Sequence, residues 1–301
     1  NTGGYMAAAI QMVNEFLPNK RLIVYTEGRK SPREDYSSNG TGSSQKMPLI
    51  VLVNEGSASA SEIFAGAIQD NDRGTIIGRR SFGKGLVQQP IEFSDGSAIR
   101  LTIARYYTPS GRCIQKPYEK GKEEEYELDL LTRYEHGEFF SADSIKQNTK
   151  EIYYTSLGRP VYGGGGIMPD FFVPIDTTQY TDYHRNLVAK GVVIKATTGY
   201  IEKHRKELQN KYKKFEAFNE KFEIDDNFLA EIRTLADKEK IKFDEKQYNQ
   251  SLPLIKTQLK ALIARDLWDM NEYFQVMNST NQSVQQALKV LNEGIYSTII
   301  Q

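Results

Sequence analysis

The opening part of the chain alternates between apolar residues at helical spacing and short apolar runs. Between Gly4 and Leu17 the apolar positions recur at helical intervals, which predicts a helix that Pro18 ends. The run Arg21–Thr26 predicts a buried strand. Residues 28–46 are rich in serine, glycine, asparagine and charge, and this composition predicts a mobile surface loop.

The next elements follow an order that favours parallel pairing. Pro48–Val53 is a continuous apolar run, typical of a strand that is covered on both faces. A helix over Ser59–Asp70 and a short strand over Thr75–Gly78 are expected after it. This β-loop-α-β order predicts an α/β core with at least some parallel strands.

The stretch from Gly83 to Tyr107 has the pattern of a β-hairpin. Two apolar runs flank Asp95-Gly96, and Asp-Gly is favoured at the tight turns of hairpins. The core is therefore expected to combine a mixed sheet with a hairpin.

Two later regions differ from the core in composition. Residues 116–160 are highly charged and aromatic, which predicts a surface insertion. From about Thr178 the chain is rich in lysine and glutamate, with apolar positions at intervals of three, four and seven. We therefore predict a core over residues 1–177 and an α-helical C-terminal domain over residues 178–301.

Composition narrows the function classes. Lys+Arg and Asp+Glu number 39 each, so the net charge does not favour nucleic acid as a partner. Cys113 is the one cysteine and the three histidines lack ligand spacing, so neither a disulfide framework nor a zinc site is expected. No run of 18 apolar residues occurs, and the start at Asn1 has no signal-peptide pattern and no methionine, which is typical of a piece of a longer chain.

A serine cluster lies where the predicted strand meets the predicted helix. Such a junction projects a side chain into a crevice and leaves free backbone N–H groups, so Ser59 is a candidate nucleophile. Ser59-Ala60-Ser61-Glu62 also fits the S-x-x-E capping box, in which the glutamate carboxylate accepts the N-cap amide. On this pattern alone, helix capping is the simpler interpretation of the cluster, and of Glu62 in particular.

Lys84 fits two short motifs imperfectly. Residues 78–84 match the G-x-x-x-x-G-K of a phosphate-binding loop, but Gly85 stands where Ser or Thr must bind magnesium. Ser81-x-x-Lys84 matches the motif of penicillin-recognising enzymes, which requires a helix, and the glycines beside Lys84 disfavour one. Both readings remain weak alternatives.

The two segments together resemble a known family. Pro48–Gln115 contains PLIVLVNEGSASASEIFAGAIQD, SFGKGLVQ and ARYYTPSGRCIQ, and it resembles the C-terminal processing (tail-specific) serine peptidases. The resemblance implies that Ser59 is the nucleophile, that Lys84 is its general base, and that Gln88 orients the lysine. It also implies a functional role for Asp70, although this residue could instead be solvated or paired with the nearby Arg73.

The same resemblance implies an oxyanion hole. The amide of Ala60 would supply one donor, and the glycine turn of Asn1-Thr2-Gly3-Gly4 the other, with Gly4 preferred over Gly3. Gly163–Asp170 resembles the family's G-x-G-I-x-P-D segment.

The implied chemistry suits these residue types. A serine hydroxyl is a weak nucleophile until a base takes its proton, and an amine can do so only when it is uncharged. The ordinary lysine pKa of about 10.4 must then fall, which burial away from counter-charges achieves. Peptide hydrolysis would proceed through an acyl-enzyme that backbone amides stabilise, and neither a metal nor a cofactor is needed.

The resemblance carries wider expectations for fold, substrate and location. It implies a crotonase-like layered core and an endopeptidase that recognises exported or misfolded proteins by their C-terminal tails, in the bacterial periplasm or cell envelope. The family's upstream PDZ domain and its first core strands are not found in these 301 residues.

Two alternatives stay open from the sequence. The core could be a non-catalytic peptide-binding or assembly scaffold derived from a peptidase. The charge-rich helices after residue 178 could form a homo-oligomer.

Overall fold

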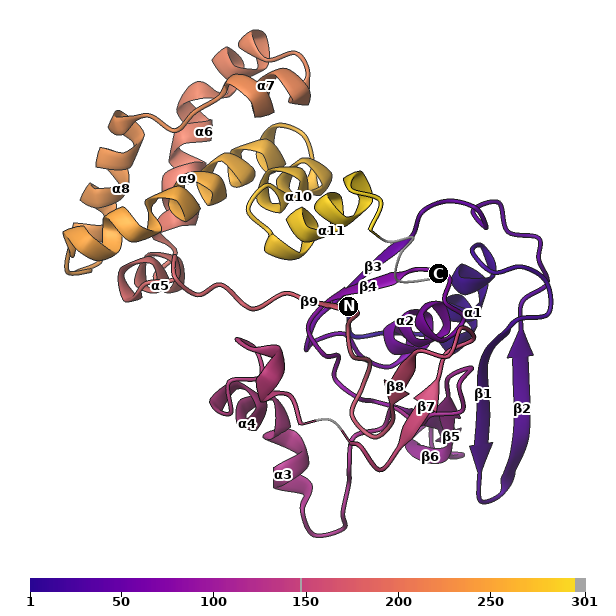
Figure 1. Ribbon diagram of the computed structural model, residues 1–301. Coiled ribbons are helices and arrows are strands. Elements are labelled where there is room, and N and C mark those ends of the chain that lie inside the picture. Colours follow the sequence, from indigo (N-terminus) through magenta and orange to yellow (C-terminus); the bar gives the residue numbers. More distant parts are fainter. Residues whose placement is uncertain (147, 296–301) are drawn as a thin grey trace. The chain divides into compact units, whose positions relative to one another are not determined.

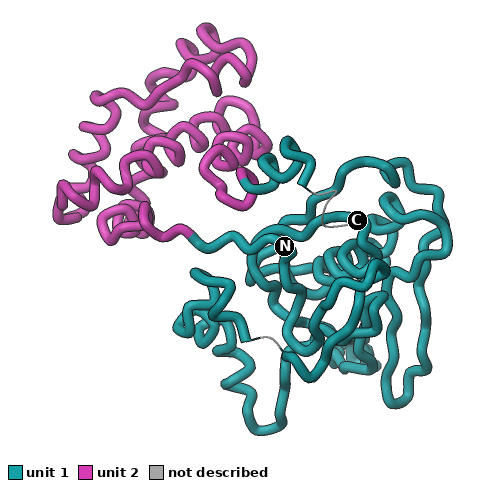
Figure 2. Tube along the Cα trace, viewed as in Figure 1, with its two compact units in different colours: residues 1–175, 286–301 teal, residues 176–285 magenta. Residues whose placement is uncertain are grey.

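The computed structural model describes residues 1–146 and 148–295 (Figure 1). The described residues fold as two compact units (Figure 2): residues 1–175 together with residues 286–295, and residues 176–285. The predicted domain boundary between residues 177 and 178 stays a prediction. It differs from the observed units mainly because residues 286–295 belong to the first unit, whereas the prediction puts them in the helical domain.

Four antiparallel strands form the larger sheet of the first unit, in the order β2-β1-β6-β5. Their bounds are β1 (Leu22–Gly28), β2 (Ser31–Ser37), β5 (Leu86–Glu92) and β6 (Ala98–Tyr107). The turn at Asp95-Gly96 joins β5 to β6, and Gly96 has a φ of +84°. The predicted hairpin is confirmed.

Strand β2 lies in the stretch that the sequence predicts as a mobile loop, and for residues 31–37 that prediction is wrong. Tyr25 of β1 pairs with Asp35, and the Arg33 guanidinium lies 3.8 Å from the centre of the Tyr25 ring. Because β2 is an edge strand with mostly exposed side chains, it needs no apolar pattern.

Three parallel strands form the second sheet, in the order β3-β4-β9. They are β3 (Ile50–Val53), β4 (Thr75–Gly78) and β9 (Phe171–Phe172). The predicted parallel pairing is confirmed, although parallel and antiparallel strands lie in separate sheets. The expectation that β3 is covered on both faces is wrong, because β3 is an edge strand and its Leu52 is 43% exposed.

Helix α2 (Ala60–Asp70) connects β3 to β4 and forms the centre of the first core. It packs beside α1 (Met6–Asn14), as Figure 1 shows. The core consists mostly of aliphatic side chains: Ala9, Val13, Leu17, Ile23, Val24, Val53, Ala60, Ile63, Ala65, Ala67, Ile68, Ile76, Tyr106, Ile114 and Ile167.

The charged stretch 116–160 lies partly at the surface, but some of its charged side chains are buried in ion pairs. It forms α3 (Glu123–Glu127), α4 (Asp129–Glu135), a 3-10 turn (Ala142–Ser144) and β7 (Ile152–Tyr154), which pairs with β8 (Pro160–Tyr162). Arg133 and Glu138 are nonetheless buried, and the Glu138 carboxylate binds both Arg133 and Arg80. These ion pairs tie the segment to Arg80, in the loop that follows β4.

The second unit is wholly helical in its regular structure, as predicted for this region. Its helices are α5 (Asp182–Ala189), α6 (Val192–Lys211), α7 (Phe215–Lys221), α8 (Asp226–Lys238), α9 (Glu245–Leu267), α10 (Met270–Asn278) and the start of α11 (Gln282–Asn292). Within the described residues, no helix is long and apolar enough to cross a membrane. The later residues of α11 return to the first unit, because Ala287 and Val290 pack with Ile77 and Val173.

We expect Ile76→Ala to destabilise the first unit by about 2–5 kcal/mol, since it removes a fully buried side chain from the middle strand and leaves a cavity. Leu52→Ala on the edge strand is the control and should change stability by less than about 1 kcal/mol, because Leu52 is largely exposed. Hydrogen exchange of the α2 and β4 amides measures both. Equal loss of protection in the two variants would contradict a core centred on β4.

Candidate active site

Ser59 lies at a strained turn between β3 and α2. It is the N-cap residue of α2, with φ +58° and ψ −121°. A positive φ at a residue other than glycine costs on the order of 1–3 kcal/mol and persists only where the surroundings enforce it. Serine nucleophiles of other hydrolases occupy strained strand-to-helix turns of this kind, which expose the hydroxyl.

Lys84 lies in an extended loop between β4 and β5. The loop passes close to other backbone at Gly83, where φ is +89° and a Cβ would lie 3.1 Å from the Gly166 nitrogen. Throughout residues 1–146 and 148–295 the structure gives the half-buried Lys84 ammonium group no hydrogen bond or ion pair. No carboxylate therefore holds its charge in place.

One buried carboxylate joins the two segments. Oε2 of Glu62 accepts the backbone N–H of Ser59 at 2.9 Å and the backbone N–H of Lys84 at 2.8 Å. Oε1 accepts the Gly83 N–H at 2.7 Å and the Ser81 hydroxyl at 2.5 Å. The Ser59 bond is the carboxylate half of the predicted capping box, but the other three bonds lie outside that motif.

A tyrosine hydroxyl joins the same two residues from the carbonyl side. The Tyr106 hydroxyl lies 3.0 Å from the Ser59 carbonyl oxygen and also contacts the Lys84 carbonyl oxygen. Burial, followed by the charge of Glu62, raises the pKa of Tyr106 well above its usual value. The hydroxyl therefore keeps its proton and acts as a donor. The structure thus brings Ser59 and Lys84 together, although they are 25 positions apart in the sequence.

The Glu62 carboxylate itself is subject to opposing effects. Burial raises its pKa, while the hydrogen bonds from Ser81, Lys84, Gly83 and Ser59 lower it, and the net direction is upward. Its side chain is fully buried. Hydrogen bonds from neutral donors thus replace a counter-ion around this group.

The glycine turn lies against the start of α2. A Cβ on Gly3, whose φ is +90°, would lie 2.5 Å from the Ala58 carbonyl oxygen and 2.8 Å from the Ala60 nitrogen. The Gly3 N–H is taken by the Asn1 side chain at 2.9 Å. In the part of the chain that the structure describes, the amides of Gly4 and Ala60 have no acceptor. Two backbone donors are therefore available beside Ser59.

A cavity of about 300 Å³ opens next to these amides. Gly4 and Ala60 line it, together with largely apolar side chains from α1, β3 and α2. The site therefore combines a strained serine, a free amine, two free amides and an apolar recess.

Comparison with known proteins supplies the family. Residues 1–127 match peptidase family S41. Over 116 residues the chain is 47% identical to a carboxyl-terminal-processing protease of Synechocystis sp. and 52% identical to a carboxy-terminal-processing protease of Bartonella bacilliformis. Residues 1–127 belong to peptidase family S41. They are called the S41 segment below.

The likeness covers part of each protein. Both matches cover 38% of this chain, and the chain spans about a quarter of the length of these relatives, 27% and 26%. The solved structure of a photosystem II D1 C-terminal processing protease matches 59% of this chain and 33% of its own, at 29% identity and a TM-score of 0.40. Residues 183–269 match a family of unknown function (DUF8443).

Within the S41 segment, the weak alternatives for Lys84 lose their structural basis. Residues 81–85 are not helical, and Ser81 is fully buried. Its hydroxyl donates to Glu62 and accepts the Ile167 N–H at 2.6 Å. Ser81 thus cannot meet a substrate, and β5, rather than a helix, follows Lys84.

Gln88 is not brought to the site. It lies on β5 opposite Thr102, next to a bulge in the hairpin, and its side chain is exposed. The described residues include no hydrogen bond between Gln88 and Lys84.

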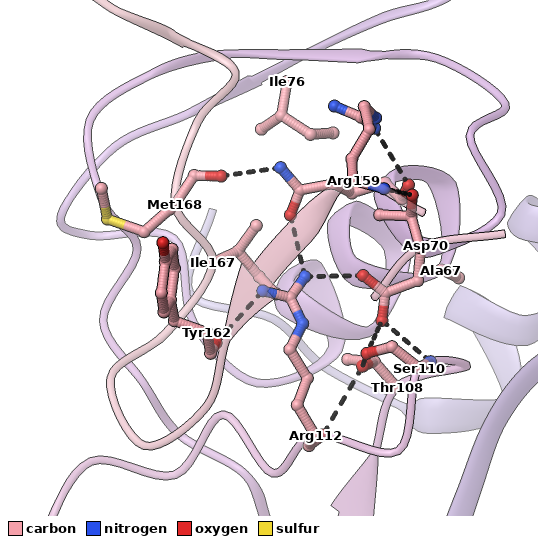
Figure 3. Close-up of polar contacts among 12 residues, drawn as sticks. Ala67, Asp70, Ile76, Thr108, Ser110, Arg112, Arg159, Tyr162, Ile167 and Met168 are labelled. Atoms are coloured by element: carbon pink, nitrogen blue, oxygen red, sulfur yellow. Dashed lines mark hydrogen bonds and ion pairs between the residues drawn. The ribbon is translucent and has the colours of Figure 1, made fainter. Parts of the chain in front are cut away.

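Asp70 lies at the far end of α2, 11 positions after Ser59, or about 16 Å along the helix. Its carboxylate binds the Arg112 guanidinium at 2.7 Å, and both side chains are fully buried (Figure 3). Ser110 completes its contacts through its hydroxyl and N–H. Asp70 therefore does not reach the nucleophile, and its partner is not Arg73, which donates to backbone carbonyls instead.

Asp70 belongs to a buried ionic network that joins α2 to later parts of the chain. Arg159 bridges Asp72 and Asp170, each at 2.7 Å. Asp170 also accepts the Ile76 N–H at 2.7 Å, which fixes the end of the predicted Gly163–Asp170 segment against β4.

Sequence reasoning missed several residues of the site. The contacts of Tyr106 and Ser81, and the bonds of Glu62 to Gly83 and Lys84, were not anticipated. The capping box was the one signal that pointed to Glu62.

We expect Arg112→Met to destabilise the first unit by about 3–5 kcal/mol, because it leaves Asp70 as a buried charge without its cation. The double variant Asp70→Leu/Arg112→Met should recover much of this loss, since the stranded charge is gone. Arg33→Met breaks an exposed pair and serves as the control, with an effect below about 1 kcal/mol. Calorimetric unfolding measures all three, and strictly additive losses in the double variant would refute the coupling.

Proposed function

We propose that the S41 segment is a serine endopeptidase site in which Ser59 is the nucleophile and Lys84 the general base. The observation that carries the proposal is the shared carboxylate: Glu62 Oε2 accepts the N–H groups of both residues. Family membership supports a serine peptidase, and the strained turn at Ser59 supports the choice of nucleophile.

The reaction would use these groups in sequence. The uncharged Lys84 amine takes the Ser59 hydroxyl proton as Oγ attacks the peptide carbonyl carbon, and the amides of Gly4 and Ala60 hold the oxyanion. The intermediate collapses when the C–N bond breaks and the lysine ammonium returns its proton to the leaving amine. Water, deprotonated by the same amine, then attacks the acyl carbon, and the lysine ammonium returns this proton to Ser59 Oγ as the ester C–O bond breaks.

Two features leave the Lys84 amine without a competing partner. Its side chain is half-buried, and in the described ranges no carboxylate pairs with it. Gln88 stays in the proposal as the side chain that orients the amine. It must turn inward from its exposed position on β5, and catalytic hydrogen bonds are often incomplete before substrate binds.

The proposal extends to the substrate and the setting. Its substrates are exported or misfolded proteins recognised by their C-terminal tails, and the names of the relatives as carboxyl-terminal-processing proteases support this. The fold is a crotonase-like core, the setting is the bacterial periplasm or cell envelope, and the helical unit supports a homo-oligomer.

We expect Ser59→Ala to abolish labelling of the chain by a fluorophosphonate probe, and Lys84→Ala to slow it by about 10²–10⁴-fold, since that is the usual contribution of a general base. Cleavage of casein should fall in parallel. Ser61→Ala, two residues from the nucleophile, is the matched control and should label like the wild type.

The proposal fails if label is found on a serine other than Ser59, or if Ser59→Ala still cuts casein. A wild-type chain that binds casein but neither labels nor cuts would favour the non-catalytic scaffold instead.

A further inference from the structure

Two side chains, Glu62 and Tyr106, form hydrogen bonds with the backbone N–H and C=O groups of both Ser59 and Lys84. Their N–H groups share one oxygen of Glu62, and their carbonyl oxygens share the hydroxyl of Tyr106. In Ser59 and in Lys84, both the N–H before the Cα and the C=O after it are therefore hydrogen-bonded. The side chains of the two residues take no part in these four bonds. We name the Glu62 carboxylate and the Tyr106 hydroxyl the backbone clamp.

Helix capping alone does not account for this arrangement. A cap contributes about 0.5–2 kcal/mol. Glu62 is fully buried, and among the described residues it forms no ion pair. Burial of a carboxylate without a cation is costly unless hydrogen bonds replace the lost water. The stabilisation from a helix cap alone would not offset the cost of burying the Glu62 carboxylate.

The surroundings hold both members of the clamp in place. The Tyr106 backbone N–H donates to the Gly85 carbonyl oxygen at 3.0 Å, which fixes β6 beside the lysine loop. Ser81 donates to the second Glu62 oxygen and accepts the Ile167 N–H. Neither Glu62 nor Tyr106 has freedom to move away from the two loops.

We propose that Glu62 and Tyr106 are positioning residues that set the separation of Ser59 and Lys84 through their backbones, without contacting the substrate. This inference rests on the proposed function of Ser59 and Lys84. Because a displacement of about 1 Å can cost about 100-fold in rate, loosening the clamp should slow the proton transfer more than it weakens substrate binding.

The test uses the complete chain and the fluorophosphonate probe. Tyr106→Phe removes only the hydroxyl, and Glu62→Gln replaces one acceptor oxygen with a donor that faces other donors. Each variant should label to full stoichiometry but about 10–100-fold more slowly, and kcat for casein should fall with KM little changed. Tyr107→Phe, next to the clamp residue, and Glu55→Gln, which breaks the pair with Arg79, are the matched controls and should keep the wild-type rate.

A purely structural role would give another result. It would lower the fraction of chains that can be labelled and leave the rate of the remainder unchanged. That outcome, or wild-type rates in both variants, would overturn the clamp. If Ser59→Ala abolishes labelling while the clamp variants label normally, the proposed function stands and only the clamp falls. If Tyr106→Phe and Glu62→Gln unfold alike by circular dichroism, the role is structural and the inference is rejected.

Discussion

The first unit is organised around a negative charge that has no cation beside it in the described part of the chain. Glu62 lies in the first turn of α2 and is fully buried, so its oxygens must find donors inside the protein. It finds them in three backbone N–H groups and one hydroxyl, drawn from the strand-to-helix turn and from the loop that precedes β5. The requirement to satisfy this group fixes the path of both segments.

The opposite end of α2 is held by a different kind of interaction. There the carboxylates of Asp70, Asp72 and Asp170 meet Arg112 and Arg159 in charge-paired contacts. Such pairs are specific in geometry and tie α2 to β4, β8 and the segment after it. The helix is thus anchored by neutral donors at the end that bears Ser59 and by ion pairs at the other end.

The sequence predicted those parts of the fold that depend on turn residues and on apolar patterns over a few neighbouring positions. The Asp95-Gly96 turn required a hairpin, and the apolar run before Ser59 followed by a helix indicated a parallel unit. Strand β2 was missed because its polar side chains are exposed and its pairing with β1 is a tertiary effect. Leu52 was expected to be buried because an apolar run does not reveal which strand lies at an edge.

The candidate site divides in the same way. Ser59 and Lys84 were found through a family resemblance, and Glu62 through its capping spacing, but no spacing in the sequence connects Tyr106 on β6 to a turn 47 residues earlier. Asp70 was given a neighbour in sequence, Arg73, whereas its partner Arg112 is 42 residues away. Contacts made by folding, rather than by proximity along the chain, are those that sequence reasoning could not supply.

The clamp bonds to Ser59 and Lys84 involve only main-chain atoms of those residues. The frame is therefore indifferent to which side chains it displays: a cysteine, an alanine or an arginine at either place would inherit the same scaffold. A substitution at position 59 or 84 would thus change the side chain and leave the backbone in place. An active and an inactive form of the site could differ by a single side-chain atom on the same backbone.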